Sequence, residues 1–184
     1  MATTIWNIDP AHTSVEFAVK HMMLTTVRGH FKDVSGTITV DDDNPGRSKI
    51  EVEIGAASLD TGVADRDTHL KSADFLDAEK HSKITFRSTR IEGSPKKEGD
   101  KLKVIGDLSI RGKTMVVTLD ATYEGQGKDP WGNQKAGAGA TTEIDRREWG
   151  LTWNQALEAG GVLVANKVRV NLEVQAVKPQ AAAS

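Results

Sequence analysis

Apolar and polar side chains alternate along residues 12–21, which read HTSVEFAVKH. Val15, Phe17 and Val19 fall on one face of this segment if it is extended, and the residues between them fall on the other. A period of two is typical of a β-strand with one side against an apolar interior and the other side in water. The next position on the apolar face is His21, so this interior could end in a polar group.

The same alternation extends over most of the chain. It predicts about eight strands, at residues 12–21, 30–41, 48–59, 82–91, 102–112, 114–125, 136–150 and 162–177. Residues 60–81 lack this period and are polar, which predicts one or two short helices that connect strands. Residues 154–161 predict a further helical turn, with Asn154 as its cap and Gly160 at its end.

Segments with one apolar and one polar face favour antiparallel strands in a sheet with one wet face. Short strands at regular spacing indicate a sandwich or a barrel, and about eight strands would close into a barrel that packs its own interior or holds one elongated ligand. Inward-facing Gly36, Gly106 and Ala121 would leave room inside. The predicted fold class is all-β, with residues 1–177 as one domain and residues 178–184 as a flexible tail.

Composition narrows the class of protein. With 184 residues, 38% of them hydrophobic and 27% charged, the chain suits one soluble globular domain. The net charge of −2 lacks the basic excess of a nucleic-acid-binding protein, and there is no cysteine for disulfides or thiolate catalysis. No apolar run is long enough to cross a bilayer, and the start, MATTIWNIDP, lacks the features of a secretion signal, so we expect a cytoplasmic protein.

Clusters of reactive side chains are few. The five histidines, at positions 12, 21, 30, 69 and 81, show no metal-ligand spacing, and we expect them to make hydrogen bonds in loops and at strand ends. Asp65, Arg66, Asp67 and His69 lie close together and could form a general acid–base pair. The favoured interpretation is that Arg66 and the neighbouring acids hold a polar helix on the barrel, so neither a catalytic residue nor a metal site is predicted.

Four stretches of the chain together resemble the YceI-like family. In order, they read WNIDPAHTSVEFAVKHMMLTTVRGHF, SLDTGVADRDTHLKSADFLDAEKHSKITFRS, GDLSIRGKTMVVTL and DRREWGLTWNQALEAGGVLVANKVRVNLEV. The resemblance covers the chain from Trp6 to Val177. It implies an extended, eight-stranded antiparallel barrel that is similar to the lipocalin architecture.

The resemblance also implies a function. Similar proteins bind an amphipathic long-chain lipid in an apolar channel, typically a polyisoprenoid such as a prenyl quinone or a prenyl phosphate, and some bind fatty acids or amides. The family commonly forms homodimers, and it implies no catalytic residue and no cofactor beyond the bound lipid. Many members carry a secretion signal, from which this sequence departs.

A lipid channel gives the inward side chains a role as its lining. The candidate lining residues are Val15, Phe17, Val19, Phe31, Ile38, Phe86, Leu108, Leu119, Trp149 and Trp153. The candidate head-group contacts are His21, Arg28 and His30, because histidine and arginine can hydrogen-bond a quinone carbonyl or a phosphate. Two alternatives stay open: an enzyme that acts on an isoprenoid lipid, and a structural or interaction barrel with a packed interior.

Overall fold

The computed structural model describes residues 3–179. These residues form eleven strands: β1 (Thr3–Ile8), β2 (Ser14–His21), β3 (Thr25–Phe31), β4 (Val34–Asp41), β5 (Lys49–Gly55), β6 (Leu59–Asp60), β7 (Lys83–Glu92), β8 (Lys101–Ile110), β9 (Lys113–Lys128), β10 (Gln134–Asp145) and β11 (Val164–Lys178). They also form one helix and four 3₁₀ turns: α1 (Ala64–Lys71), η1 (Pro10–His12), η2 (Pro45–Arg47), η3 (Ala56–Ser58) and η4 (Arg146–Trp149). The tail expected at residues 178–184 lies outside the described residues, apart from residues 178 and 179.

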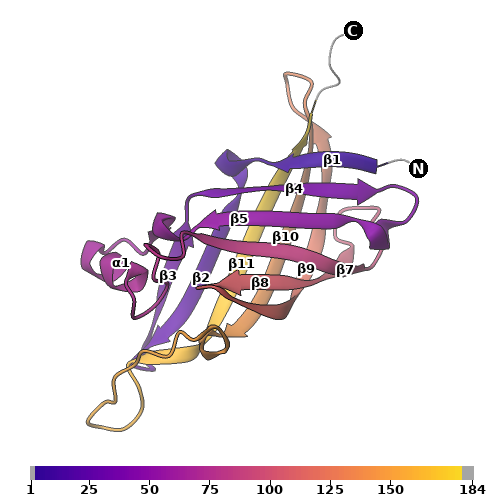
Figure 1. The fold of residues 1–184 in the computed structure, drawn as a ribbon. Coiled ribbons are helices and arrows are strands. Elements are labelled where there is room, and N and C mark those ends of the chain that lie inside the picture. The colour runs from indigo at the N-terminus through magenta and orange to yellow at the C-terminus, as the bar shows by residue number, and fades with distance from the viewer. Residues whose placement is uncertain (1–2, 180–184) are drawn as a thin grey trace.

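Eight of the strands form a closed antiparallel barrel, which confirms the predicted fold class. Neighbouring strands follow the order β1-β4-β5-β7-β8-β9-β10-β11, and β11 pairs again with β1. This closing seam is short: Asn7 lies opposite Val177, and Ile8 lies opposite Ala176. Figure 1 shows β1, β4, β5, β7 and β8 crossing in front of β9, β10 and β11, so the two halves of the barrel face each other.

The remaining strands, β2, β3 and β6, continue the sheet beside the barrel. β11 is long enough to pair with β1 near its C-terminal end and with β2 between Val164 and Glu173. β3 pairs with β2 over its whole length, and β6 adds two residues opposite His30 and Phe31. The β2–β3 hairpin therefore projects from the barrel at the end that carries α1 (Figure 1).

Several strand assignments differ from the pattern in the sequence. The pattern does not predict most of β3, and the strands predicted at residues 48–59 and 136–150 run into the 3₁₀ turns η3 and η4. The alternation does not predict β1, because in so short a segment only Trp6 and Ile8 are buried. The segment predicted as one strand at residues 30–41 is two strands, since the chain bends at Lys32 and Asp33 between β3 and β4. A short bend of this kind leaves the period of two almost unchanged on either side, so the sequence pattern does not reveal it.

The helical turn predicted at residues 154–161 is wrong. The side-chain amide of Asn154 donates to the carbonyl oxygen of Val164 at 2.7 Å and accepts from the N–H of Val164 at 3.0 Å. Asn154 therefore closes a loop instead of capping a helix. The helix expected within residues 60–81 is present as α1, and no helix in the described part of the chain is long and apolar enough to cross a membrane.

The room expected inside the barrel at Gly36 and Gly106 is filled. A Cβ at Gly106 would lie 2.6 Å from Cζ of Phe86, and a Cβ at Gly36 would lie 3.0 Å from Cδ1 of Ile8. The two glycines thus let large side chains lie close against the backbone, and the expectation that they widen the interior is wrong. Ala121, the third small residue, does line the interior cavity.

Candidate ligand-binding cavity

The inward faces of the strands enclose a cavity of about 680 Å³. Sites for small molecules typically have volumes of roughly 300–1,000 Å³. All eight strands of the closed barrel contribute apolar side chains to the wall. A hollow interior of this size does not fit the alternative of a barrel filled by its own side chains.

Nine of the ten side chains predicted to line a channel lie on the cavity wall: Val15, Phe17, Val19, Phe31, Ile38, Phe86, Leu108, Leu119 and Trp149. The tenth, Trp153, lies outside the wall. Its ring packs edge-on against His69, with the ring centroids 4.6 Å apart, and lies 5.4 Å from the ring of Phe75. Because Phe75 is itself a wall residue, Trp153 supports the wall from behind.

The three predicted head-group contacts do not lie on the cavity wall. Val19 is the last side chain of β2 on the wall, and His21 already begins the turn into β3. Arg28 and His30 are exposed on β3. The alternation gives the correct face for Val19, but it does not reveal that the hairpin continues past the end of the cavity.

β10 supplies wall residues that were not assigned to the site from the sequence. Ala136, Ala138 and Ala140 line the cavity, and the pairing of β10 with β9 shifts register between Gly137 and Ala138. Small side chains here leave space that bulky residues would fill. The run AGAGA at residues 136–140 is the signal in the sequence that could have identified this part of the wall.

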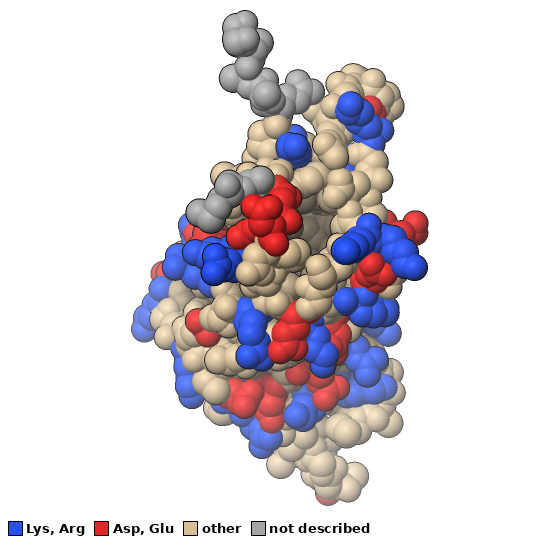
Figure 2. All heavy atoms as spheres, turned by 90° about the vertical axis from the view of Figure 1, so that its right-hand side faces the viewer, with Lys and Arg blue, Asp and Glu red and all other residues tan. Residues whose placement is uncertain are grey.

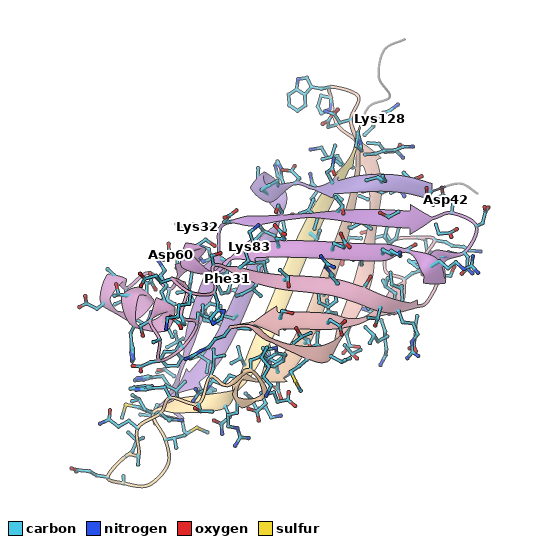
Figure 3. The ribbon with its side chains drawn as sticks, viewed as in Figure 1. Phe31, Lys32, Asp42, Asp60, Lys83 and Lys128 are labelled. Atoms are coloured by element: carbon cyan, nitrogen blue, oxygen red, sulfur yellow. The ribbon has the colours of Figure 1, made fainter. Side chains whose placement is uncertain are left out.

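The cavity opens to solvent at a polar mouth. Wall residues there come from the turns after β4 and β7 and from the end of β9, and include Asp41, Asp42, Ser48, Ser94, Lys96 and Gln126. Figure 2 shows this face hollowed beside a group of acidic side chains, with basic side chains across the hollow. Asp42 is labelled at this end of the barrel in Figure 3. The mouth therefore offers both donors and acceptors to a polar group of a ligand.

The opposite end of the cavity is covered. Phe75, Leu76 and Trp149 lie on the wall there and are between 2% and 9% exposed. The indole N–H of Trp149 donates to the carbonyl oxygen of Leu108 at 2.9 Å, which fixes the ring over this end. The segment after α1 and the η4 turn thus form a cover made mainly of aromatic and aliphatic side chains.

Arg146 is a buried cation on the wall near this cover, with 5% of its surface exposed. Its guanidinium donates to the backbone carbonyl oxygens of Leu151 (2.6 Å), Ala165 (2.9 Å), Trp153 (2.9 Å) and Val164 (3.3 Å). Burial lowers the pKa of Arg146, and the carbonyl dipoles compensate for the lost hydration. The side chain therefore ties residues 151–165 across the covered end.

The acidic and basic cluster at residues 65–69 is divided among separate partners. Asp67 accepts from the N–H of Thr61 at 2.8 Å and from its hydroxyl, and Arg66 donates to the hydroxyl and carbonyl oxygens of the same threonine. His69 instead pairs with Asp74 at 2.9 Å. None of the residues 65–69 lies on the cavity wall. These contacts fasten α1 to the chain that precedes it and do not assemble an acid–base pair at the cavity.

A closed antiparallel barrel with an apolar cavity and one polar mouth defines the lipocalin-like class of barrels. Within that class, the model of the YceI-like domain matches residues 6–176, and the chain belongs to the YceI-like family. Protein YceI of Escherichia coli O157:H7 is 43% identical over 140 residues, which cover 76% of this chain and 71% of that protein. The UPF0312 protein of Serratia proteamaculans is 42% identical over 141 residues, which cover 77% and 71%.

Solved structures share the barrel. The YceI protein of Campylobacter jejuni has a TM-score of 0.73 at 30% identity, and the match covers 88% of this chain and 90% of that one. BcnA of Burkholderia cenocepacia has a TM-score of 0.77 at 23% identity and covers 91% and 98%. A polyisoprenoid binding domain from Saccharophagus degradans has a TM-score of 0.70 at 12% identity and covers 95% and 98%. The last two likenesses show the fold alone.

Proposed function

We propose that this protein binds an amphipathic long-chain lipid, with the apolar tail in the cavity and the polar head at the mouth. The observation that carries the proposal is the apolar cavity of about 680 Å³ with a polar opening at one end. A tail against Phe17, Phe86 and Leu119 would leave water, and each buried methylene contributes about 0.8 kcal/mol. The head would stay hydrated or hydrogen-bonded at the mouth, so no polar group need be buried without a partner.

A polyisoprenoid is the tail chemistry that we propose. The wall places the bulky side chains of Leu102 and Tyr123 opposite the small side chains of Ala121 and Ala138, and this uneven surface suits a methyl-branched chain. Support also comes from the neighbour in Saccharophagus degradans, which is described as a polyisoprenoid binding domain. A straight-chain fatty acid would meet the same wall with fewer close contacts, because it has no branches to occupy the recesses.

The charges at the mouth favour an uncharged head group. Asp41 and Asp42 lie there together with Lys96 and Gln126, so the mouth is mixed in charge and not basic. A quinone carbonyl or a hydroxyl can accept from Lys96 or Gln126 without placing another negative charge beside two carboxylates. We therefore favour a prenyl quinone or a prenol over a prenyl phosphate.

Organic extraction of the purified protein, followed by mass spectrometry, tests the proposal. We expect one dominant isoprenoid lipid in a stoichiometric amount, and we expect the delipidated protein to take up an added prenyl quinone. A fatty acid as the dominant lipid would contradict the proposed tail but not lipid binding. A protein without bound lipid that also fails to take up prenyl quinones and fatty acids would contradict lipid binding itself.

A single substitution on β10 provides a second test. Ala138→Trp places an indole in the cavity, and we expect the bound lipid to fall to about a tenth or less, because the ring occupies the space of the tail. Thr141→Trp is the matched control, since Thr141 is exposed on the same strand. Circular dichroism should show both variants folded. Equal lipid content in the two variants would mean that the cavity is not the binding site.

A further inference from the structure

The β2–β3 turn, residues 22–24, and the loop of residues 155–163 together form an apolar tip. Residues 22–24, Met-Met-Leu, are 39%, 63% and 74% exposed. The N–H of Met22 donates to the carbonyl oxygen of Leu163 at 2.8 Å, which holds the loop beside the turn. The loop reads QALEAGGVL, and Glu158 is its one charged residue. Figure 2 shows the lower end of the molecule, where these segments lie in Figure 1, as largely uncharged.

The backbone conformation of the β2–β3 turn does not explain why methionines occupy its two central positions. Met22 and Met23 have φ values of 52° and 58°, in the left-handed region, and the N–H of Leu24 donates to the carbonyl oxygen of His21 at 3.0 Å. Asparagine and glycine are the residues that such two-residue hairpin turns prefer, and other residues adopt this conformation at a cost. Exposed methionines at both positions thus oppose the stability of the turn, which points to a role in binding.

Basic side chains stand behind the apolar tip. Arg28 and Arg169 lie on either side of Ala18 in the sheet, and Lys20 and Lys167 lie nearer the tip on β2 and β11. All four basic side chains are exposed, whereas Ala18 is only 8% exposed. This arrangement places a band of positive charge directly behind the exposed apolar residues.

Acidic side chains also lie near this band. On β10, Glu143 lies opposite Arg169 and Asp145 lies opposite Lys167. Asp145 is also held by Arg147, at 2.6 Å, so its charge is already compensated by another arginine. Glu158 lies in the loop and Glu148 lies in η4. On the strands that carry the band, β2, β3 and β11, the acidic residues are Glu16 and Glu173, and both lie farther from the tip than the four basic side chains. On these strands the charge nearest the tip is therefore positive.

We propose that the apolar tip docks on the surface of a lipid bilayer that contains anionic lipids. Methionine and leucine side chains would enter the boundary between headgroups and acyl chains, while Lys20, Arg28 and Arg169 would contact the anionic headgroups. A second copy of this chain is a poorer occupant, because a symmetric contact between two tips would bring both basic bands together. Docking in this way leaves the mouth, at the other end of the barrel, directed away from the bilayer (Figures 1 and 3).

Co-sedimentation with vesicles tests this proposal independently of any ligand in the cavity. We expect the full chain to bind vesicles of equal parts phosphatidylcholine and phosphatidylglycerol, and to bind pure phosphatidylcholine vesicles more weakly. Raising the salt concentration should reduce binding to the anionic vesicles, because it screens the basic band.

Two sets of substitutions separate the apolar and the electrostatic parts. Met22→Asn with Met23→Gly and Leu24→Ser should weaken binding about tenfold or more, since the side chains that enter the bilayer are gone. The same variant should unfold at a higher temperature than the wild type if the turn is relaxed, which shows that lost binding is not lost folding. Lys20→Gln with Arg28→Gln should weaken binding to anionic vesicles by about fivefold for each charge and leave binding to neutral vesicles unchanged.

Ile5→Ser is the matched control, because Ile5 is 53% exposed on β1, away from the apolar tip. It should bind vesicles as the wild type does. The proposal is wrong if the wild type does not sediment with anionic vesicles, or if the tip variant sediments as well as the wild type. It is also wrong if light scattering shows a dimer that the tip variant abolishes while vesicle binding is unchanged, because the tip would then be a contact between two copies.

Discussion

Two glycines allow aromatic rings of the cavity wall to lie directly over the backbone. A Cβ at Gly106 would lie 2.6 Å from Cζ of Phe86, and a Cβ at Gly29 would overlap Cζ of Phe17. Both phenylalanines line the cavity. At the scale of the single residue, a missing side chain on one strand therefore sets the position of a large side chain on its neighbour.

Gly106→Ala should destabilise the protein by about 1–3 kcal/mol, because the new methyl group overlaps the Phe86 ring and the carbonyl oxygen of Arg87. The free energy of unfolding in urea measures this loss. Gly127→Ala is the control: it also lies in a strand, and nothing lies within 4 Å of its added Cβ. If the two alanine variants are equally stable, close packing at Gly106 does not limit the position of the ring.

At the scale of the element, α1 is held by polar contacts together with one half-buried side chain, Leu70, which packs against the core. None of its residues is buried. Its attachment runs through Thr61, which is bound by both Arg66 and Asp67. The buried residues of this segment, Phe75 and Leu76, come after the helix and cover the end of the cavity. The helix therefore serves to position the cover that follows it.

Asp67→Ala should loosen this segment, because the N–H and hydroxyl of Thr61 lose their acceptor. A loss of about 1–1.5 kcal/mol corresponds to roughly tenfold faster amide exchange in residues 61–76, with the barrel strands unchanged. Hydrogen exchange followed by mass spectrometry measures this difference. Asp65→Ala is the control, since Asp65 is exposed on the same helix. Equal exchange in the two variants would show that Asp67 does not hold α1.

At the scale of the whole molecule, several carboxylates stabilise the folded state over the unfolded chain. Hydrogen bonding from Arg147 lowers the pKa of Asp145 to about 2, and hydrogen bonding from Lys32 lowers the pKa of Asp60. A folded-state pKa below the unfolded value means that the folded protein binds fewer protons in acid. This stability is present above the unfolded pKa of about 3.9 and is lost as the pH falls toward the folded value.

The free energy of unfolding should therefore decrease as the pH is lowered from about 5 to about 2. Asp145→Asn should make this decrease shallower, because asparagine does not titrate, and it should lower the stability at pH 7 by removing the ion pair with Arg147. Urea unfolding at a series of pH values measures both effects. An unchanged acid slope in the variant would show that Asp145 titrates alike in the folded and unfolded states.

Most of the barrel could be predicted from local pattern, but its ends could not. Strand β2 keeps a period of two along this part of the sheet, so its side chains Val15, Phe17 and Val19 all lie on the cavity wall. His21 follows the same period but lies beyond the cavity, because the β2–β3 hairpin extends past the end of the cavity wall. The prediction that Trp153 lines the cavity is wrong for a related reason, because a large aromatic residue in a loop can lie on either side of the cavity wall.

The sequence by itself determined that the chain makes amphipathic strands and belongs with YceI-like proteins, because alternation and motif order are properties of neighbouring residues. Only the tertiary structure decided that Asn7 meets Val177 to close the barrel, that one end is open and polar, and that Arg146 is buried at the other. These facts depend on which distant segments pair and on how far each strand extends. Such pairings are set by the free energy of the whole sheet, and no local period contains them.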